Sequence, residues 1–195
     1  MNWIIEHWVE LIGALLGLVF VLLEIKQHIF LWPIGIATSI FYIFVFFSAR
    51  FYADMALQFY YVGVSIYGWV WWLRGSKHTN KPEIPVTHVP SRMIIPLALI
   101  TFLLCIVMAF VLQTYTDSPV PVGDAFTTAL SITATWMLAR KYIEQWLVWI
   151  VVNGVSLGLY VYKELYPTSV LFFVYFILAF LGYYNWKRTL IQTKS

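Results

Sequence analysis

The chain has 195 residues, of which 62% are hydrophobic, 19% are aromatic and only 11% are charged. Soluble domains contain about 25% charged and about 45–50% apolar residues, so this composition excludes a water-soluble globular protein. The formal net charge of +3 is too small to indicate a nucleic-acid partner.

Seven apolar segments have the length and composition of helices that cross a bilayer. In chain order they cover residues 8–25, 30–48, 52–73, 93–113, 123–139, 145–162 and 167–186. The N-terminus has neither a basic region nor a small-residue cleavage site, so it is interpreted as the mature start and not as a signal peptide. The sequence therefore predicts an all-α integral membrane protein with seven transmembrane helices.

Basic residues are distributed unevenly between the two ends of these segments. One side holds the N-terminus and only Arg50 and Lys163, whereas the other holds Lys26, Arg74, Lys77, Lys81, Arg92, Arg140, Lys141, Lys187, Arg188 and Lys194. Because basic residues gather on the cytoplasmic side, the N-terminus is predicted to lie outside and the C-terminus in the cytoplasm.

The first three predicted helices repeat as the last three when the chain is shifted by 114 residues. The shift places Trp32 on Trp146, Tyr52 on Tyr166, Leu57 on Leu171, Phe59 on Phe173, Tyr61 on Tyr175, Gly68 on Gly182 and Trp72 on Trp186. One helix separates the two triplets, so both would cross in the same direction as parallel repeats, which is a transporter architecture. The predicted division is a first three-helix bundle (1–75), a linker loop with an inverting fourth helix and an outer loop (76–122), and a second three-helix bundle with a cytoplasmic tail (123–195).

A polar stripe runs along the predicted helix 145–162. Spacings of 3, 4, 3 and 4 place five residues on one helical face, namely Trp146, Trp149, Asn153, Ser156 and Tyr160. An amide in hydrocarbon without a partner costs several kcal/mol. The stripe must therefore face other helices or a cavity, and it is interpreted as half of a solute path.

Polar residues from both repeats are predicted to lie near the middle of the bilayer, where transporter sites built from repeats are expected. The candidate substrate-binding residues are Asn153, Trp149, Gln58, Tyr61, Tyr160, Ser39, Tyr175, Ser131 and Trp146. Four of them have a structural alternative. Ser131 could hydrogen-bond to the previous helical turn, and Trp146 could be an interfacial anchor. Asn153 and Gln58 could form hydrogen bonds between helices.

The sequence lacks the residues that several classes of function require. No G-x-x-x-x-G-K-[ST] motif, metal-spaced histidine pair or catalytic triad occurs, so neither an enzyme, a metal nor a cofactor is expected. Glu24 lies in the inner part of a helix, but no carboxylate is predicted at mid-depth, which disfavours ion coupling while Glu24 leaves it open. A neutral aromatic chamber suits a flat ring, including a cationic one. A phosphate would find no Lys or Arg there.

The segments 31–75 and 141–186 resemble the PnuC family of vitamin transporters, and the resemblance extends over nearly the whole chain. Its most specific parts are YADMALQFYY, YGWVWW and the WLVW and VVN residues. The resemblance implies a 3+1+3 fold similar to the SWEET sugar carriers. It further implies facilitated uptake of nicotinamide riboside across a bacterial inner membrane, with a cytoplasmic kinase trapping the solute.

By the same resemblance, Trp149 and Asn153 would line the vitamin site, with Gln58 and Tyr61 opposite. Many relatives carry Asp at the position of Asn153, and the missing acid weakens attraction for a cation. Nicotinamide riboside and thiamine both contain a cationic aromatic ring without phosphate, so thiamine remains an alternative, and riboflavin is carried by other relatives. A non-transporting membrane scaffold or enzyme subunit, a sugar carrier and a homo-oligomeric assembly also remain open.

Overall fold

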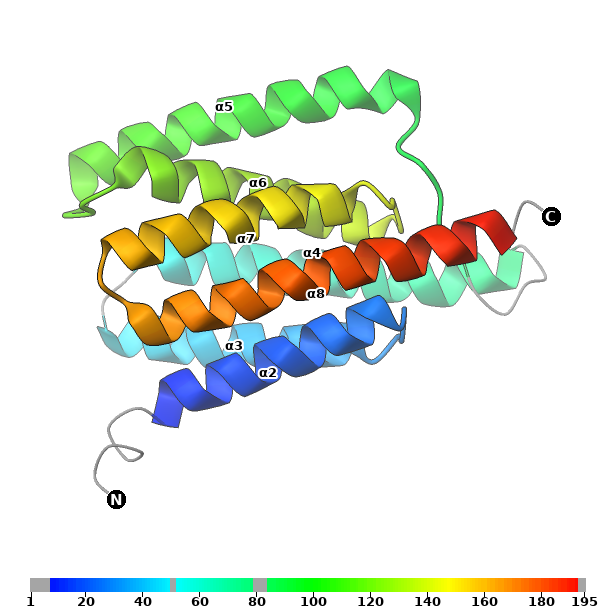
Figure 1. Ribbon diagram of the computed structural model, residues 1–195, viewed down its shortest axis with the longest axis horizontal. Coiled ribbons are helices and arrows are strands. Elements are labelled where there is room, and N and C mark those ends of the chain that lie inside the picture. Colours follow the sequence, from blue (N-terminus) through cyan, green and yellow to red (C-terminus); the bar gives the residue numbers. More distant parts are fainter. Residues whose placement is uncertain (1–7, 50–51, 79–83, 193–195) are drawn as a thin grey trace. The chain divides into compact units, whose positions relative to one another are not determined.

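The computed structural model describes residues 8–49, 52–78 and 84–192. Seven helices make up almost all of this part of the chain (Figure 1). They are α2 (Trp8–Ile25), α3 (Leu31–Ala49), α4 (Tyr52–His78), α5 (Ser91–Tyr115), α6 (Pro121–Ala139), α7 (Gln145–Tyr162) and α8 (Tyr166–Gln192). For the residues that the structure describes, the prediction of an all-α fold with seven helices is confirmed.

The largest differences from the predicted boundaries are at the C-terminal ends of α4 and α8. The apolar segments were expected to end at residues 73 and 186, whereas the helices continue to His78 and Gln192. The added turns contain Lys, Arg and other polar residues. Hydropathy marks the part of a helix that lipid can cover, but backbone hydrogen bonding continues beyond it.

Three of the described helices, α5, α7 and α8, are long and apolar enough to cross a membrane by length and composition. Two shorter apolar stretches are Leu11–Ile25 and Leu31–Phe47. The remaining helices differ because Tyr and Trp are abundant in α4, and Thr and Ser in α6. Such residues lower hydropathy but belong in helices that face other helices.

The chain divides into two compact units, Met1–Ile84 and Pro85–Ser195. In the first unit, α3 packs against α2 and α4. In the second, α5 packs on α6, α6 on α7, and α7 on α8. None of the residues of α5 is buried, and its exposed side chains are mainly Ile, Leu, Val and Phe, as expected for a helix that faces lipid.

The internal repeat extends to backbone geometry. Under the same 114-residue shift, the described range of α4 coincides with that of α8, and the described ranges of the other two pairs differ by one residue. Gln27 and Lys141, which the shift superposes, both have φ of 55°. Their amides donate to equivalent carbonyls, Glu24 and Leu138, at 3.0 and 2.9 Å. A left-handed conformation is uncommon outside glycine, so its recurrence indicates that each unit contains the same α–turn–α structure.

A short extended segment holds the α6–α7 turn. The Thr87 amide donates to the Lys141 carbonyl at 3.1 Å, and the Ile143 amide donates to the Thr87 carbonyl at 3.0 Å. The carboxylate of Glu144 accepts from the Val89 amide at 3.0 Å and lies 2.6 Å from His88 Nδ1. The chain that leads into α5 is thereby fastened to the start of α7.

Candidate solute-binding site

The polar stripe of α7 lies on its protein-facing side. Asn153 is 6% exposed, and Ser156 is also buried. Leu147 and Val151, on the opposite side of the helix, are exposed. This arrangement is what the spacing predicts, because residues three or four apart share a face and an amide in lipid would lose its hydrogen bonds.

The two tryptophans of the stripe have different surroundings. Trp146 is 1% exposed, and its ring meets Trp186 of α8 edge to face, with centroids 5.7 Å apart. Its ring is therefore occupied by packing between α7 and α8. Trp149 is only half-buried. The indole nitrogens of both tryptophans are buried without a hydrogen-bond partner in the described part of the chain. Of the two, Trp149 is the better placed to contact a solute.

Two predicted site residues from different helices, Tyr160 on α7 and Tyr175 on α8, meet through a third ring. Phe172 lies 4.9 Å from the Tyr160 ring and 5.8 Å from the Tyr175 ring. The ammonium of Lys163 is 5.7 Å from the centroid of the Tyr160 ring. The structure thus gathers an aromatic cluster at one end of the stripe, which sequence spacing alone could not assign to specific partners.

The hydroxyls of α6 donate to their own helix. Ser131 donates to the Thr127 carbonyl at 2.8 Å, and Thr135 donates to the Ser131 carbonyl at 2.7 Å. Such bonds satisfy the hydroxyl hydrogen and leave only oxygen lone pairs for a ligand. Ser131 therefore makes the hydrogen bond to the previous helical turn that was its structural alternative. A solute could form a hydrogen bond with Ser131 only by donating one to its hydroxyl oxygen.

The candidates on the first unit lie on α3 and α4. Ser39, the repeat equivalent of Asn153, is 5% exposed. Gln58 and Tyr61, one turn apart on α4, are half-buried, and the Tyr61 ring is 5.5 Å from that of Tyr60. The placement of Gln58 and Tyr61 opposite Asn153 remains a prediction.

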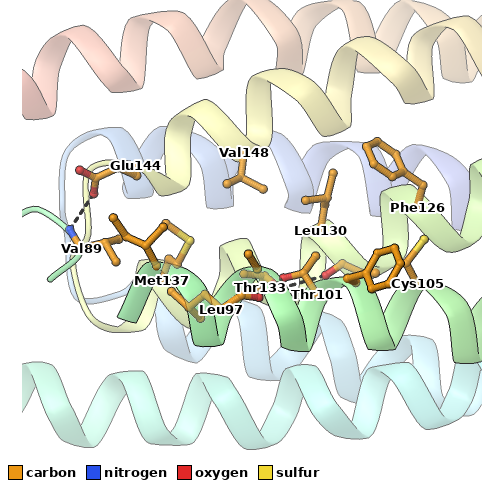
Figure 2. Close-up of a pocket in the computed structure, with 14 residues that line it drawn as sticks. Val89, Leu97, Thr101, Cys105, Phe126, Leu130, Thr133, Met137, Glu144 and Val148 are labelled. Atoms are coloured by element: carbon orange, nitrogen blue, oxygen red, sulfur yellow. Dashed lines mark hydrogen bonds between the residues drawn. The ribbon is translucent and has the colours of Figure 1, made fainter. Parts of the chain in front are cut away.

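A cavity of about 510 Å³ lies within the second unit, between α5, α6 and α7 (Figure 2). Apolar side chains such as Leu97, Leu130 and Val148 make up most of its lining. The hydroxyl oxygens of Thr101 and Thr133 are hydrogen-bonded to each other, 2.6 Å apart. The cavity contains none of the predicted site residues, and its lining offers little to a polar solute.

Charged side chains are confined to the ends of the helices around the stripe. Asp124, in the first turn of α6, accepts from Lys163 at 2.8 Å and from the Ser118 hydroxyl at 2.6 Å. The helix α7 contains no charged residue, and Lys187 and Arg188 lie near the end of α8. The middle of this three-helix group therefore offers hydrogen bonds and rings, but no cation for a phosphate.

Sequence reasoning missed two features. The pairing of Asp124 with Lys163 joins residues far apart in the chain, and no sequence pattern signals it. Gln145, one turn before Trp149 and on the same face, is 0% exposed with both amide atoms unpartnered among the described residues. Its four-residue spacing from Trp149 is a sequence signal that could have identified it as part of the polar stripe.

Comparisons with known proteins agree with this architecture. The family described as nicotinamide mononucleotide transporter matches residues 7–188. The nicotinamide riboside transporter PnuC of Escherichia coli is 24% identical over 92% of this chain and 84% of its own length. The riboflavin/roseoflavin transporter RibM of Streptomyces davaonensis is 23% identical over 92% of this chain and 84% of its own. A crystal structure of the vitamin B3 transporter PnuC superposes with a TM-score of 0.74 at 23% identity, covering 96% of this chain and 83% of that one, which shows a shared fold.

Proposed function

The chain belongs to the nicotinamide mononucleotide transporter family, and on this premise we propose that it takes up the unphosphorylated nucleoside nicotinamide riboside. Membership makes it a multi-pass membrane transporter and not an enzyme. The proposal concerns the solute and the mechanism. It is supported by the names of the relatives, several of which are nicotinamide riboside transporters.

One observation favours the riboside over the mononucleotide in the family's description. The buried stripe of α7 has amide, hydroxyl and indole groups, and no Lys or Arg lies along α6 or α7. A phosphate carries up to two negative charges and is normally bound by Arg, Lys or a helix N-terminus. A buried phosphate without such a partner would lose its hydration with little in return. The riboside has the same pyridine ring and ribose without that cost.

In the proposed site, Trp149 and Asn153 of α7 contact the ring and its polar substituent. The roles of Gln58 and Tyr61 of α4 are those that the family resemblance implies. Ser39, Ser131 and Tyr175 complete the wall, and Trp146 and Tyr160 hold the stripe in position. A cationic pyridinium on Trp149 gains about 0.5–2 kcal/mol from the aromatic face.

Transport would proceed by alternating access, in which two three-helix bundles (1–75 and 123–195) rock about the site. The duplicated backbone of the two units supports this mechanism, because two bundles of equivalent structure can interchange their conformations during the transport cycle. The N-terminus lies outside and the C-terminus in the cytoplasm. No carboxylate lies in α7, so we propose facilitated diffusion, with a cytoplasmic kinase phosphorylating the riboside and preventing its return.

Uptake into proteoliposomes tests the proposal. Labelled nicotinamide riboside should enter vesicles that contain the protein and equilibrate without an ion gradient, and unlabelled riboside should compete. Nicotinamide mononucleotide should not compete. Uptake of labelled thiamine or riboflavin by vesicles that do not take up the riboside would replace the proposed solute with that vitamin. Uptake of none of these compounds would contradict the proposal and favour a non-transporting role.

A further inference from the structure

The first turn of α7 contains a polar side chain that contributes no hydrogen bond to the fold. Gln145 is 0% exposed, and neither Oε1 nor Nε2 has a hydrogen-bond partner among the described residues. Its backbone amide already donates to the Tyr142 carbonyl at 3.3 Å. Buried polar side chains in folded proteins are nearly always hydrogen-bonded, because each unsatisfied group costs free energy. The Gln145 amide therefore requires a reason other than folding.

Gln145 lies in line with two candidate binding residues. Gln145, Trp149 and Asn153 are spaced by four residues, so they follow one another along the same face, about 6 Å apart per step. The Trp149 indole nitrogen is also buried without a partner in the described part of the chain. The face is opposite the exposed residues Leu147 and Val151. An amide, an indole and a second amide thus form a row about 12 Å long.

We propose that Gln145 is a second solute-binding amide, and that this row binds an elongated, flat solute with hydrogen-bonding groups at both ends. The inference rests on the proposed function. The ring lies on Trp149, while Asn153 binds one polar end and Gln145 the other. A glutamine amide has two donors and an acceptor, which match a carboxamide or a pair of ribose hydroxyls.

The row also determines which molecules are poor solutes. A ring with one polar end leaves one of the two amides unsatisfied and loses the free energy of those hydrogen bonds. A neutral amide offers a phosphate no charge compensation. The length of the row thus selects for nucleoside-sized compounds over the free base, and its neutrality selects against nucleotides.

The test uses Gln145→Met, which retains the length of the side chain and removes its polar atoms. Binding is measured by calorimetry on the purified protein with nicotinamide riboside, nicotinamide (no ribose) and pyridine riboside (no carboxamide). We expect the affinity for nicotinamide riboside to fall about tenfold. The affinity for whichever fragment lacks the group bound by Gln145 should not change. Gln113→Met, which replaces an exposed glutamine of α5, is the matched control and should bind as the wild type.

Thermal unfolding without ligand separates a binding role from a structural one. Removing an unpartnered buried amide should leave the unfolding midpoint unchanged or raise it. A lower midpoint for Gln145→Met, an equal loss of affinity for all three ligands, or no loss for nicotinamide riboside would each overturn the inference. If the wild type binds thiamine or riboflavin in place of the riboside, the proposed function fails. The same comparison of variant and wild type with that vitamin then decides on Gln145.

Discussion

Trp146 lies so close to Gly182 that a Cβ atom added to the glycine would be 2.4 Å from the indole ring. The first unit contains the same relationship between Trp32 and Gly68, also at 2.4 Å. In both units the indole occupies the space that a side chain would need, and it packs α3 against α4 in the first unit and α7 against α8 in the second. The two units therefore share this close tryptophan–glycine contact as well as a pattern of residues.

Substituting Gly182→Ala should destabilise the protein. The added methyl group cannot fit beside the Trp146 ring without displacing it, and overpacking costs about 1–3 kcal/mol. We expect a lower unfolding midpoint in detergent and weaker solute binding, because Trp149 lies one turn from the displaced ring. Gly158→Ala is the control, since nothing lies within 4 Å of a Cβ at that position of α7. Equal midpoints for the two variants would show that the close approach is unimportant.

Substituting Asn153→Leu should abolish uptake of the solute while the protein remains folded in the membrane. The change removes an amide from the buried face and retains a side chain of similar size, so the loss concerns hydrogen bonds to the solute. Vesicle uptake and membrane abundance are measured together. Val151→Leu, on the exposed face of the same helix, should transport normally. Normal uptake by Asn153→Leu would remove this residue from the site.

The ion pair between Asp124 and Lys163 should couple the start of α6 to the end of α7. Lys163 contacts both carboxylate oxygens, at 2.8 and 3.0 Å, and both side chains are partly buried. A double-mutant cycle with Asp124→Asn and Lys163→Met should give a coupling free energy of about 1–3 kcal/mol in unfolding. Additive effects of the two substitutions would contradict this role.

Replacing Glu144→Ala should loosen the segment that precedes α5. The carboxylate accepts a hydrogen bond from the Val89 amide and contacts His88, so its loss leaves two backbone hydrogen bonds to hold this segment. Hydrogen exchange should become faster at the amides of Thr87 and Val89, with little change in the middle of α7. Asp117→Ala, an exposed acid at the other end of α5, serves as the control. Unchanged exchange at Val89 would refute the assignment.

The sequence by itself determined the number of helices, their cores and the internal repeat. Helices in a membrane must satisfy their own backbone hydrogen bonds, so apolar length is closely tied to helix position. The matched tryptophans and glycines predicted a duplication that extends to the φ values of Gln27 and Lys141. The periodicity of α7 likewise identified the side that is buried, because a face follows from local geometry alone.

Only the tertiary structure decided what each side chain on that face contacts. Trp146 and Trp149 look alike in the sequence, yet Trp146 is fully buried against Trp186 and Trp149 is only half-buried. The Ser131 hydroxyl donates to its own helix, whereas the Gln145 side-chain amide has no hydrogen-bond partner among the described residues. Such differences depend on the rotation and separation of neighbouring helices, which are set by contacts between residues distant in the chain and are not encoded in local spacing.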